Sequence, residues 1–148
     1  MISPEILRRY PYFAGIDEAS LRLLAMVAEE KLHIPAGTRL FDEGVPVKHL
    51  AIILRGEVNI QYLLGSGEMR TVDTLVGGDL LGFSAFITPY RYTGFGTTTQ
   101  VTDLVLIDAK KLRDLCDSSP QLGYQLIREV AKLLAHRLEG ARVQLAAV

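Results

Sequence analysis

The chain has 148 residues, 49% of them hydrophobic, and its 16 lysine and arginine residues nearly balance 17 aspartate and glutamate residues, for a net charge of -1. This balance argues against a protein that coats nucleic-acid phosphates, which needs a basic surface, and the single cysteine, Cys116, excludes an internal disulfide and fits a reducing cytoplasm. The chain has neither a run of about eighteen apolar residues nor a basic start followed by an apolar stretch, so we expect a cytoplasmic protein without a membrane span or signal peptide.

Two short helices are predicted at the N-terminal end. Ser3-Pro4 is a typical helix start, with proline at the first helical position, and predicts a helix over about 4–10. Asp17 can cap a second helix. The apolar residues after Asp17 keep the helical period: Leu21, Leu24, Val27 and Ala28. We therefore assign residues 1–30 to N-terminal helices.

Beyond residue 31 the apolar residues alternate with polar ones, which is the period of a strand. Glycine-rich turns such as Asp42-Glu43-Gly44 and Gly65-Ser66-Gly67 separate short segments that are rich in Ile, Val, Leu and Tyr. The predicted strands are 49–54, 57–64, 68–75, 93–100 and 103–107. Turns that recur about every ten residues, without long helices between them, indicate an antiparallel barrel or sandwich over 31–107.

The chain is expected to end in two helices. Asp108 can cap a short helix, and Ser119-Pro120 opens the longest helix, which runs to about residue 146. Apolar residues of this helix recur in the alternating steps of a coiled-coil seam: Ile127, Ala131, Leu134, Leu138, Ala141 and Leu145. A neighbouring stripe suits packing on the barrel: Leu122, Leu126, Val130 and Leu133. We expect a homodimer through the seam; the alternative is one broad stripe that faces the core.

The most informative stretch is 77–86, which is followed closely by Tyr92-Thr93-Gly94. It is a glycine-punctuated turn that opens a short helix within a chain of strands. A turn of this kind directs several backbone N–H groups at one point, where an anion can bind. The stretch resembles the phosphate-binding cassette of the cyclic-nucleotide-binding domain found in the Crp/Fnr family of bacterial regulators.

This resemblance spans nearly the whole chain. Segments similar to the family's landmarks follow one another in its order and at its spacing: 11–13, 37–44, 50–58, 78–82, 104–107, 110–112 and the long last helix. The resemblance implies a mainly β fold with flanking helices, a double-stranded β-helix or jelly-roll barrel of eight strands with the ligand inside. We expect one domain over 1–148, with N-terminal helices over 1–30, a barrel over 31–107 that contains the cassette-like turn 77–94, and C-terminal helices over 108–148.

Two positions of the cassette depart from the family's pattern. Where the family has a glutamate that accepts a hydrogen bond from the ribose hydroxyl, this chain has Phe83. Where the family has an arginine that binds the phosphate, it has Tyr92, with Arg91 one residue earlier. A hydrogen bond to a charged group contributes about 1.5–3 kcal/mol. The loss of two would weaken the binding of an ordinary cyclic nucleotide by roughly a hundred- to ten-thousandfold.

Each candidate ligand-binding residue has a functional and a structural interpretation. Phe83 can stack on a ligand base or fill the pocket as core. Arg91 can reach a phosphate or remain a solvated loop residue, and Arg70, at one mouth of the barrel, can supply a cation or extend into water. Ile60 and Val72 can form pocket walls or ordinary core. The full candidate set is Gly82, Phe83, Ser84, Ala85, Arg91, Tyr92, Thr93, Ile60, Val72 and Arg70.

The sequence gives little support for an enzyme. His33, His49 and His136 are scattered and share no metal-ligand spacing, so we predict no metal site. A nucleophile pair of Cys116 and His136 has no third member and no oxyanion turn. We therefore expect a non-enzymatic domain, and the only cofactor that the resemblance implies is a cyclic nucleotide or another small anion.

Two functional hypotheses remain. In the first, the domain is a sensor: a small anion binds beneath the glycine turn and shifts how the last helix packs on the barrel. In the second, it is a degenerate domain that works as a dimeric interaction module, with Phe83 and Tyr92 filling the cavity. The family's regulators carry a helix-turn-helix after the last helix. Because this chain stops at Val148, we expect no direct DNA binding by these residues.

Overall fold

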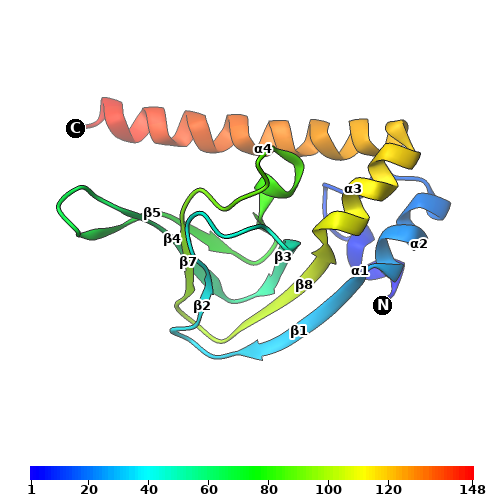
Figure 1. The fold of residues 1–148 in the computed structure, drawn as a ribbon, viewed down its shortest axis with the longest axis horizontal. Coiled ribbons are helices and arrows are strands. Elements are labelled where there is room, and N and C mark those ends of the chain that lie inside the picture. Colours follow the sequence, from blue (N-terminus) through cyan, green and yellow to red (C-terminus); the bar gives the residue numbers. More distant parts are fainter.

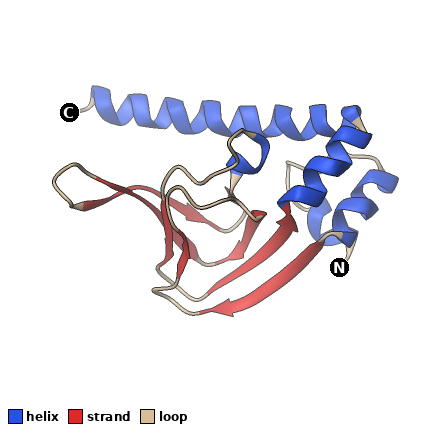
Figure 2. Ribbon diagram, viewed as in Figure 1, coloured by secondary structure: helices blue, strands red, loops and turns tan.

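A computed structural model describes residues 1–148. Two four-stranded antiparallel sheets, β1-β8-β3-β6 and β2-β7-β4-β5, form the jelly roll, and helices cover one end and one side of it (Figures 1 and 2). The predicted fold class is confirmed. The elements in chain order are α1 (Pro4–Arg8), α2 (Glu18–Met26), β1 (Ala28–Ile34), β2 (Arg39–Phe41), β3 (His49–Arg55), β4 (Glu57–Leu63), β5 (Met69–Val76), β6 (Leu80–Leu81), the 3-10 helix η1 (Phe83–Phe86), β7 (Phe95–Thr98), β8 (Thr102–Asp108), α3 (Ala109–Ser118) and α4 (Pro120–Ala146).

The two N-terminal helices begin where the sequence predicts. The hydroxyl of Ser3 accepts a hydrogen bond from the N–H of Glu5, and the carboxylate of Asp17 accepts one from the N–H of Ser20. Their ends differ from the prediction, because α1 stops at Arg8 and α2 at Met26. Ala28, which was predicted to be helical, instead opens β1 opposite Ile107 of β8. Sheet pairing decides its conformation, so the helical segment ends before residue 30 and the barrel begins before residue 31.

The five predicted strands all exist, with ends shifted by at most two residues. The largest change is in the segment 93–100, of which only Phe95–Thr98 forms a strand, β7. The strands β1, β2 and β6 were not predicted. Strand β1 has seven residues, but five exposed residues in a row separate its two buried ends, so it shows no two-residue period. Strands β2 and β6 hold too few residues to show a period, since β2 has three and β6 has two.

Strand β3 lies between β8 and β6 and is buried on both faces. Leu50 and Ile52 point into a main core of 19 buried residues that the helices cover. Ala51 and Ile53 point the other way, into a core of seven buried residues inside the roll. Alternate residues of one strand thus contribute to two cores, and the barrel is attached to the helices through this strand.

Helix α4 lies along one side of the barrel, and its C-terminal half extends past the main core over the β4–β5 hairpin (Figure 1). Of the stripe predicted to pack on the barrel, Leu122, Leu126 and Val130 are buried and Leu133 is half-buried. The remainder of α4 is half-buried or exposed. None of the helices combines the length and the apolar character needed to span a membrane.

A polar contact holds the irregular pairing of β1 with β8. The register shifts between Lys31 and Ile34, and His33 there has a positive φ of 59°. Asp103 of β8 accepts a hydrogen bond from the His33 N–H (2.8 Å) and pairs with the Arg55 guanidinium (3.1 Å). The His33 N–H and the Arg55 charge lower the pKa of the Asp103 carboxyl.

Because the folded pKa of Asp103 is lowered, its carboxylate stabilises the fold above the unfolded pKa of about 4, and this contribution is lost as the pH falls through the lower folded value. We expect Asp103→Asn, which keeps an acceptor for His33, to unfold more easily than the wild type at pH near 7 in urea titrations. The gap should narrow as the pH falls below about 4. Asp114→Asn, at an exposed pair with Lys110, is the control and should show little effect; a pH-independent gap for Asp103→Asn would contradict the account.

Candidate functional site

The glycine turn between β6 and η1 requires glycine at residue 82. Gly82 has a left-handed backbone, with φ 80° and ψ 32°. A Cβ on this residue would lie 2.5 Å from the carbonyl oxygen of His49 in β3. The turn therefore lies directly against the sheet. The N–H groups of Phe83 and Ser84, at the start of η1, have no acceptor within that helix.

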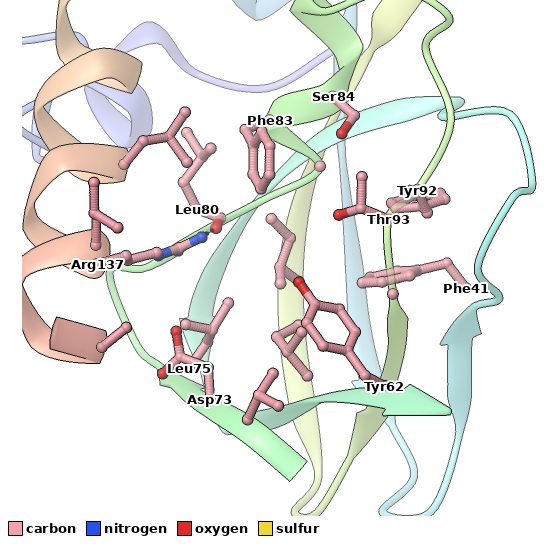
Figure 3. A pocket seen from close by; sticks show the side chains of 18 residues that line it. Phe41, Tyr62, Asp73, Leu75, Leu80, Phe83, Ser84, Tyr92, Thr93 and Arg137 are labelled. Carbon is pink, nitrogen blue, oxygen red and sulfur yellow. Dashed lines mark hydrogen bonds between the residues drawn. The ribbon is translucent and has the colours of Figure 1, made fainter. Parts of the chain in front are cut away.

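A cavity of about 340 Å³ lies between this turn, the sheet β2-β7-β4-β5 and α4 (Figure 3). It is lined by 18 residues, 12 of them hydrophobic. From the turn and η1 come Leu80, Leu81, Gly82, Phe83 and Ser84; from the sheet and the loop before β7 come Phe41, Ile60, Tyr62, Val72, Asp73, Leu75, Tyr92, Thr93 and Gly94; and from α4 come Leu134, Arg137, Leu138 and Ala141.

Seven of the ten candidate ligand-binding residues lie together around this cavity. They are Gly82, Phe83, Ser84, Tyr92, Thr93, Ile60 and Val72. Ala85 does not join them, because η1 turns its side chain into the main core, where it is fully buried.

The two candidate cations do not line the cavity. Arg91 is exposed and donates a hydrogen bond to the carbonyl oxygen of Gly44 (2.8 Å), in a segment that bridges to Pro46. Arg70 lies opposite Tyr62 near the tip of the β4–β5 hairpin, where its side chain is 61% exposed and 3.6 Å from Glu68. Their solvated interpretations therefore hold in this structure.

Phe83 and Tyr92 occupy the two positions where the resemblance leads us to expect the polar groups of the family's cassette. The ring of Tyr92 stacks on that of Phe41, with centroids 4.0 Å apart and planes inclined by 5°. Gly96 allows this packing, because a Cβ there would collide with the Phe41 ring. Burial raises the pKa of Tyr92. Phe83 is half-buried, packs on the main core and also borders the cavity, so its position is compatible with both interpretations.

Sequence analysis missed Arg137, the only cation that lines the cavity. Figure 3 shows the Arg137 side chain extending from α4 toward Leu80. The Nη2 of Arg137 donates a hydrogen bond to the carbonyl oxygen of Leu80 (2.8 Å). A signal was present: Arg137 lies three residues after Leu134 and four residues before Ala141 on a helix, so the three share a face. The coiled-coil seam is defined by apolar residues alone, so it does not include Arg137.

Asp73 was missed because of a bulge in β5. Ile60 pairs with Asp73 and Gln61 with Thr71, which leaves Val72 as an extra residue. At this bulge the side chains of β5 no longer alternate strictly between the two faces of the sheet, and both Val72 and Asp73 border the cavity. The Asp73 carboxylate accepts a hydrogen bond from the N–H of Thr74 (2.9 Å).

Half of the predicted dimer seam faces the cavity in the single chain. Leu134, Leu138 and Ala141 line it. The other seam residues, Ile127, Ala131 and Leu145, are exposed, and Leu145 is 75% exposed. The apolar face of α4 therefore has two parts, one that covers the cavity and one that no residue of this chain covers.

Contacts outside the cavity hold the glycine turn and its loop. Arg113 of α3 donates to the carbonyl oxygen of Ala85 (3.0 Å) and lies over the Tyr90 ring, 4.1 Å from its centroid. The Tyr12 hydroxyl donates to the carbonyl oxygen of Gly78 (3.0 Å), and burial is the main cause that raises its pKa. The loop is thus connected to α3 and to the N-terminal segment. No group of three or more His, Cys, Asp and Glu side chains is placed to hold a metal ion.

Comparisons with known proteins agree with this geometry. Residues 31–119 match the family model of the cyclic nucleotide-binding domain. A CRP-like cAMP-activated global transcriptional regulator of Mycobacterium tuberculosis is 28% identical over 130 residues, which cover 88% of this chain and 58% of that regulator. Among solved structures, a protein of Geobacter metallireducens GS-15 has a TM-score of 0.85 and 34% identity over 93% of this chain and 99% of that one. The regulatory domain of Toxoplasma gondii PKA, crystallised with cAMP, has a TM-score of 0.69 and 28% identity over 80% and 45%.

The glycine requirement at the turn can be tested with a matched pair. Gly78 and Gly82 both have positive φ, but a Cβ at Gly78 would meet nothing within 4 Å. Gly78→Ala should lower the free energy of unfolding by about 1–2 kcal/mol, the cost of a left-handed alanine. Gly82→Ala should lower it by about 1–3 kcal/mol more, because the turn must move off His49. Urea unfolding of both variants checks this, and equal losses would show that the turn does not press on β3.

Proposed function

The chain belongs to the cyclic nucleotide-binding domain family, and we propose that it is a non-enzymatic regulatory domain that senses a small ligand, a cyclic nucleotide or another small anion. The observation that carries this proposal is the cavity of about 340 Å³, which is bordered on one side by the glycine turn and the barrel and on the other by α4. A ligand in this position would contact both parts of the molecule. The hydroxyls of Ser84, which is buried, and of Thr93, which is exposed, belong to residues that line this cavity and can bind the polar atoms of the ligand.

Sensing would follow from unequal affinity for two positions of α4. A ligand shifts an equilibrium only by the difference between its affinities for the two states. Four residues of α4 border the cavity, whereas Leu122, Leu126 and Val130 anchor the start of the helix in the core. The C-terminal half of α4 is therefore the part that occupancy of the cavity would influence.

The two positions at which this chain departs from the family's cassette restrict how a nucleotide can bind. Phe83 offers no acceptor for a ribose hydroxyl, and Tyr92, stacked on Phe41, offers no cation for a phosphate. A cyclic nucleotide in the family's usual orientation would lack both contacts. The Mycobacterium tuberculosis relative is named as cAMP-activated; this chain spans 58% of that protein, and cAMP activation is not carried over to it.

One observation favours the alternative, a ligand-free interaction module. The stacked pair of Phe41 and Tyr92, together with the half-buried Phe83, occupies space that polar groups use in the family. In that case the rings stabilise the barrel and the surface of α4 carries the function.

The sensor hypothesis is tested by calorimetric titration of the wild type with a panel of cyclic mono- and dinucleotides. We expect at least one saturable binding isotherm, with slower hydrogen exchange in the C-terminal half of α4 when the ligand is bound. Ligand at about 100 times its Kd should stabilise the fold by about 2.7 kcal/mol. If no nucleotide of the panel binds, the result would contradict nucleotide sensing.

The double variant Phe83→Glu with Tyr92→Arg separates the two hypotheses further. If the rings serve as filling, introducing two charged groups into an apolar space should lower the free energy of unfolding by about 2 kcal/mol or more. The control is Ile87→Glu with Val101→Arg, which introduces the same charges at exposed positions. A double variant as stable as the wild type that gains cAMP binding would overturn the interaction-module alternative.

We also propose that two copies pair through the exposed part of the α4 seam, where Ile127 is 44% exposed. The wild type should then have twice the 16.3 kDa mass of one chain in light scattering, and Ile127→Asp should have the mass of one chain, because a charge would enter an apolar seam. Ile127 is a better target than Leu134, which also lines the cavity. Val143→Asp, on another face of α4, is the matched control and should keep the wild-type mass.

A further inference from the structure

The positive charge that borders the cavity comes from α4. Arg137 is the only cationic residue among the 18 that line it, and the only carboxylate is that of Asp73. Asp73 is an exposed residue, so water screens its charge. Arg137 is half-buried in a lining that is mostly apolar, and its charge acts more strongly within the cavity.

Most N–H donors of the Arg137 guanidinium have no hydrogen-bond acceptor within the chain. It takes part in none of the seven salt bridges of the chain. Its single hydrogen bond goes to the carbonyl oxygen of Leu80, whereas a guanidinium carries five N–H donors in a planar fork that matches oxyanions. A partly desolvated cation without a carboxylate partner is unfavourable unless an anion joins it.

The opposite side of the cavity is aromatic. Tyr62 and the stacked pair of Phe41 and Tyr92 lie across from α4 in Figure 3. Gly94 leaves room for Tyr62, since a Cβ there would lie 2.6 Å from the ring. No cation lies on this side, because Arg91 is exposed and bonded to Gly44. This wall suits a flat apolar body and offers nothing to balance a charge.

Resting on the sensor function proposed above, we propose that the ligand is a small ring-bearing monoanion whose oxyanion binds Arg137 of α4 and whose ring lies against Phe41, Tyr62 and Tyr92. The anion is then held by the helix rather than by the cassette. A cyclic nucleotide satisfies this description only with its phosphate toward α4, and aryl carboxylates and sulfonates satisfy it as well.

A pair of fluorescent probes tests this orientation. 8-Anilinonaphthalene-1-sulfonate is a ring-bearing monoanion, and N-phenyl-1-naphthylamine has the same rings without the sulfonate. Fluorescence titration of the full chain should show that Arg137→Gln weakens binding of the anionic probe by about tenfold or more, while binding of the neutral probe is unchanged. Arg137→Lys, which retains the charge without the fork, should fall between the wild type and Arg137→Gln.

Arg128→Gln is the matched control, because Arg128 is exposed on the same helix and nine residues from Arg137, which places it on the opposite face; it should bind both probes as the wild type does. Circular dichroism and urea midpoints check that each variant is folded. In the unmodified protein, the side-chain N–H signal of Arg137 should shift in NMR spectra with the anionic probe and not with the neutral one, so the test does not depend on a variant that folds.

The outcomes separate this inference from the proposed function. Equal binding of the anionic probe by the wild type and Arg137→Gln, with the NMR signal unmoved, would overturn the Arg137 assignment and leave a cavity that still binds ligands. If neither probe binds the wild type, the assignment is overturned, whereas the sensor function is decided by the titration with the nucleotide panel. A loss of both probes in a folded Arg137→Gln variant would show a structural role for Arg137 and would also overturn the assignment.

Discussion

The contact between Gly82 and the His49 carbonyl is the constraint on which the candidate site depends. Only a residue without Cβ, in a left-handed conformation, can place the turn this close to β3. The contact directs η1 so that Phe83 and Ser84 border the cavity while Ala85 enters the main core. The turn rests on β3, which is buried on both faces, and Arg113 and Tyr12 hold its loop from outside.

The polarity of the cavity differs from what the cassette resemblance implies. The family pattern places a carboxylate and a cation beside the glycine turn, and this chain has rings at both positions, one of them stacked on Phe41. The remaining cation, Arg137, belongs to α4. In the complex that we propose, the charge of the ligand is recognised by the helix and not by the barrel. Since α4 also carries exposed apolar residues such as Ile127 and Leu145, one helix combines the charge that faces the cavity with the surface proposed for pairing.

Much of the fold could be predicted because its signals are local. Caps at Ser3, Asp17 and Asp108 set where helices begin, and two-residue alternation located five of the eight strands, β1 being the only long one that it missed. The errors lie where tertiary contacts override a local pattern. Ala28 continues a helical period yet pairs with Ile107 of β8. The bulge at Val72 brings Asp73 to the cavity against the alternation of β5.

The sequence by itself determined the family, the jelly roll, the glycine turn and the aromatic identity of residues 83 and 92, because each depends on residue identity and on spacing along the chain. The tertiary structure alone decided which cation faces the cavity. Arg70, Arg91 and Arg137 are equivalent in charge, and they differ only in where the hairpin tip, the Gly44 carbonyl and the packing of α4 hold them. Long side chains can reach several partners, so their role follows from the three-dimensional neighbours that fix them and not from their place in the sequence.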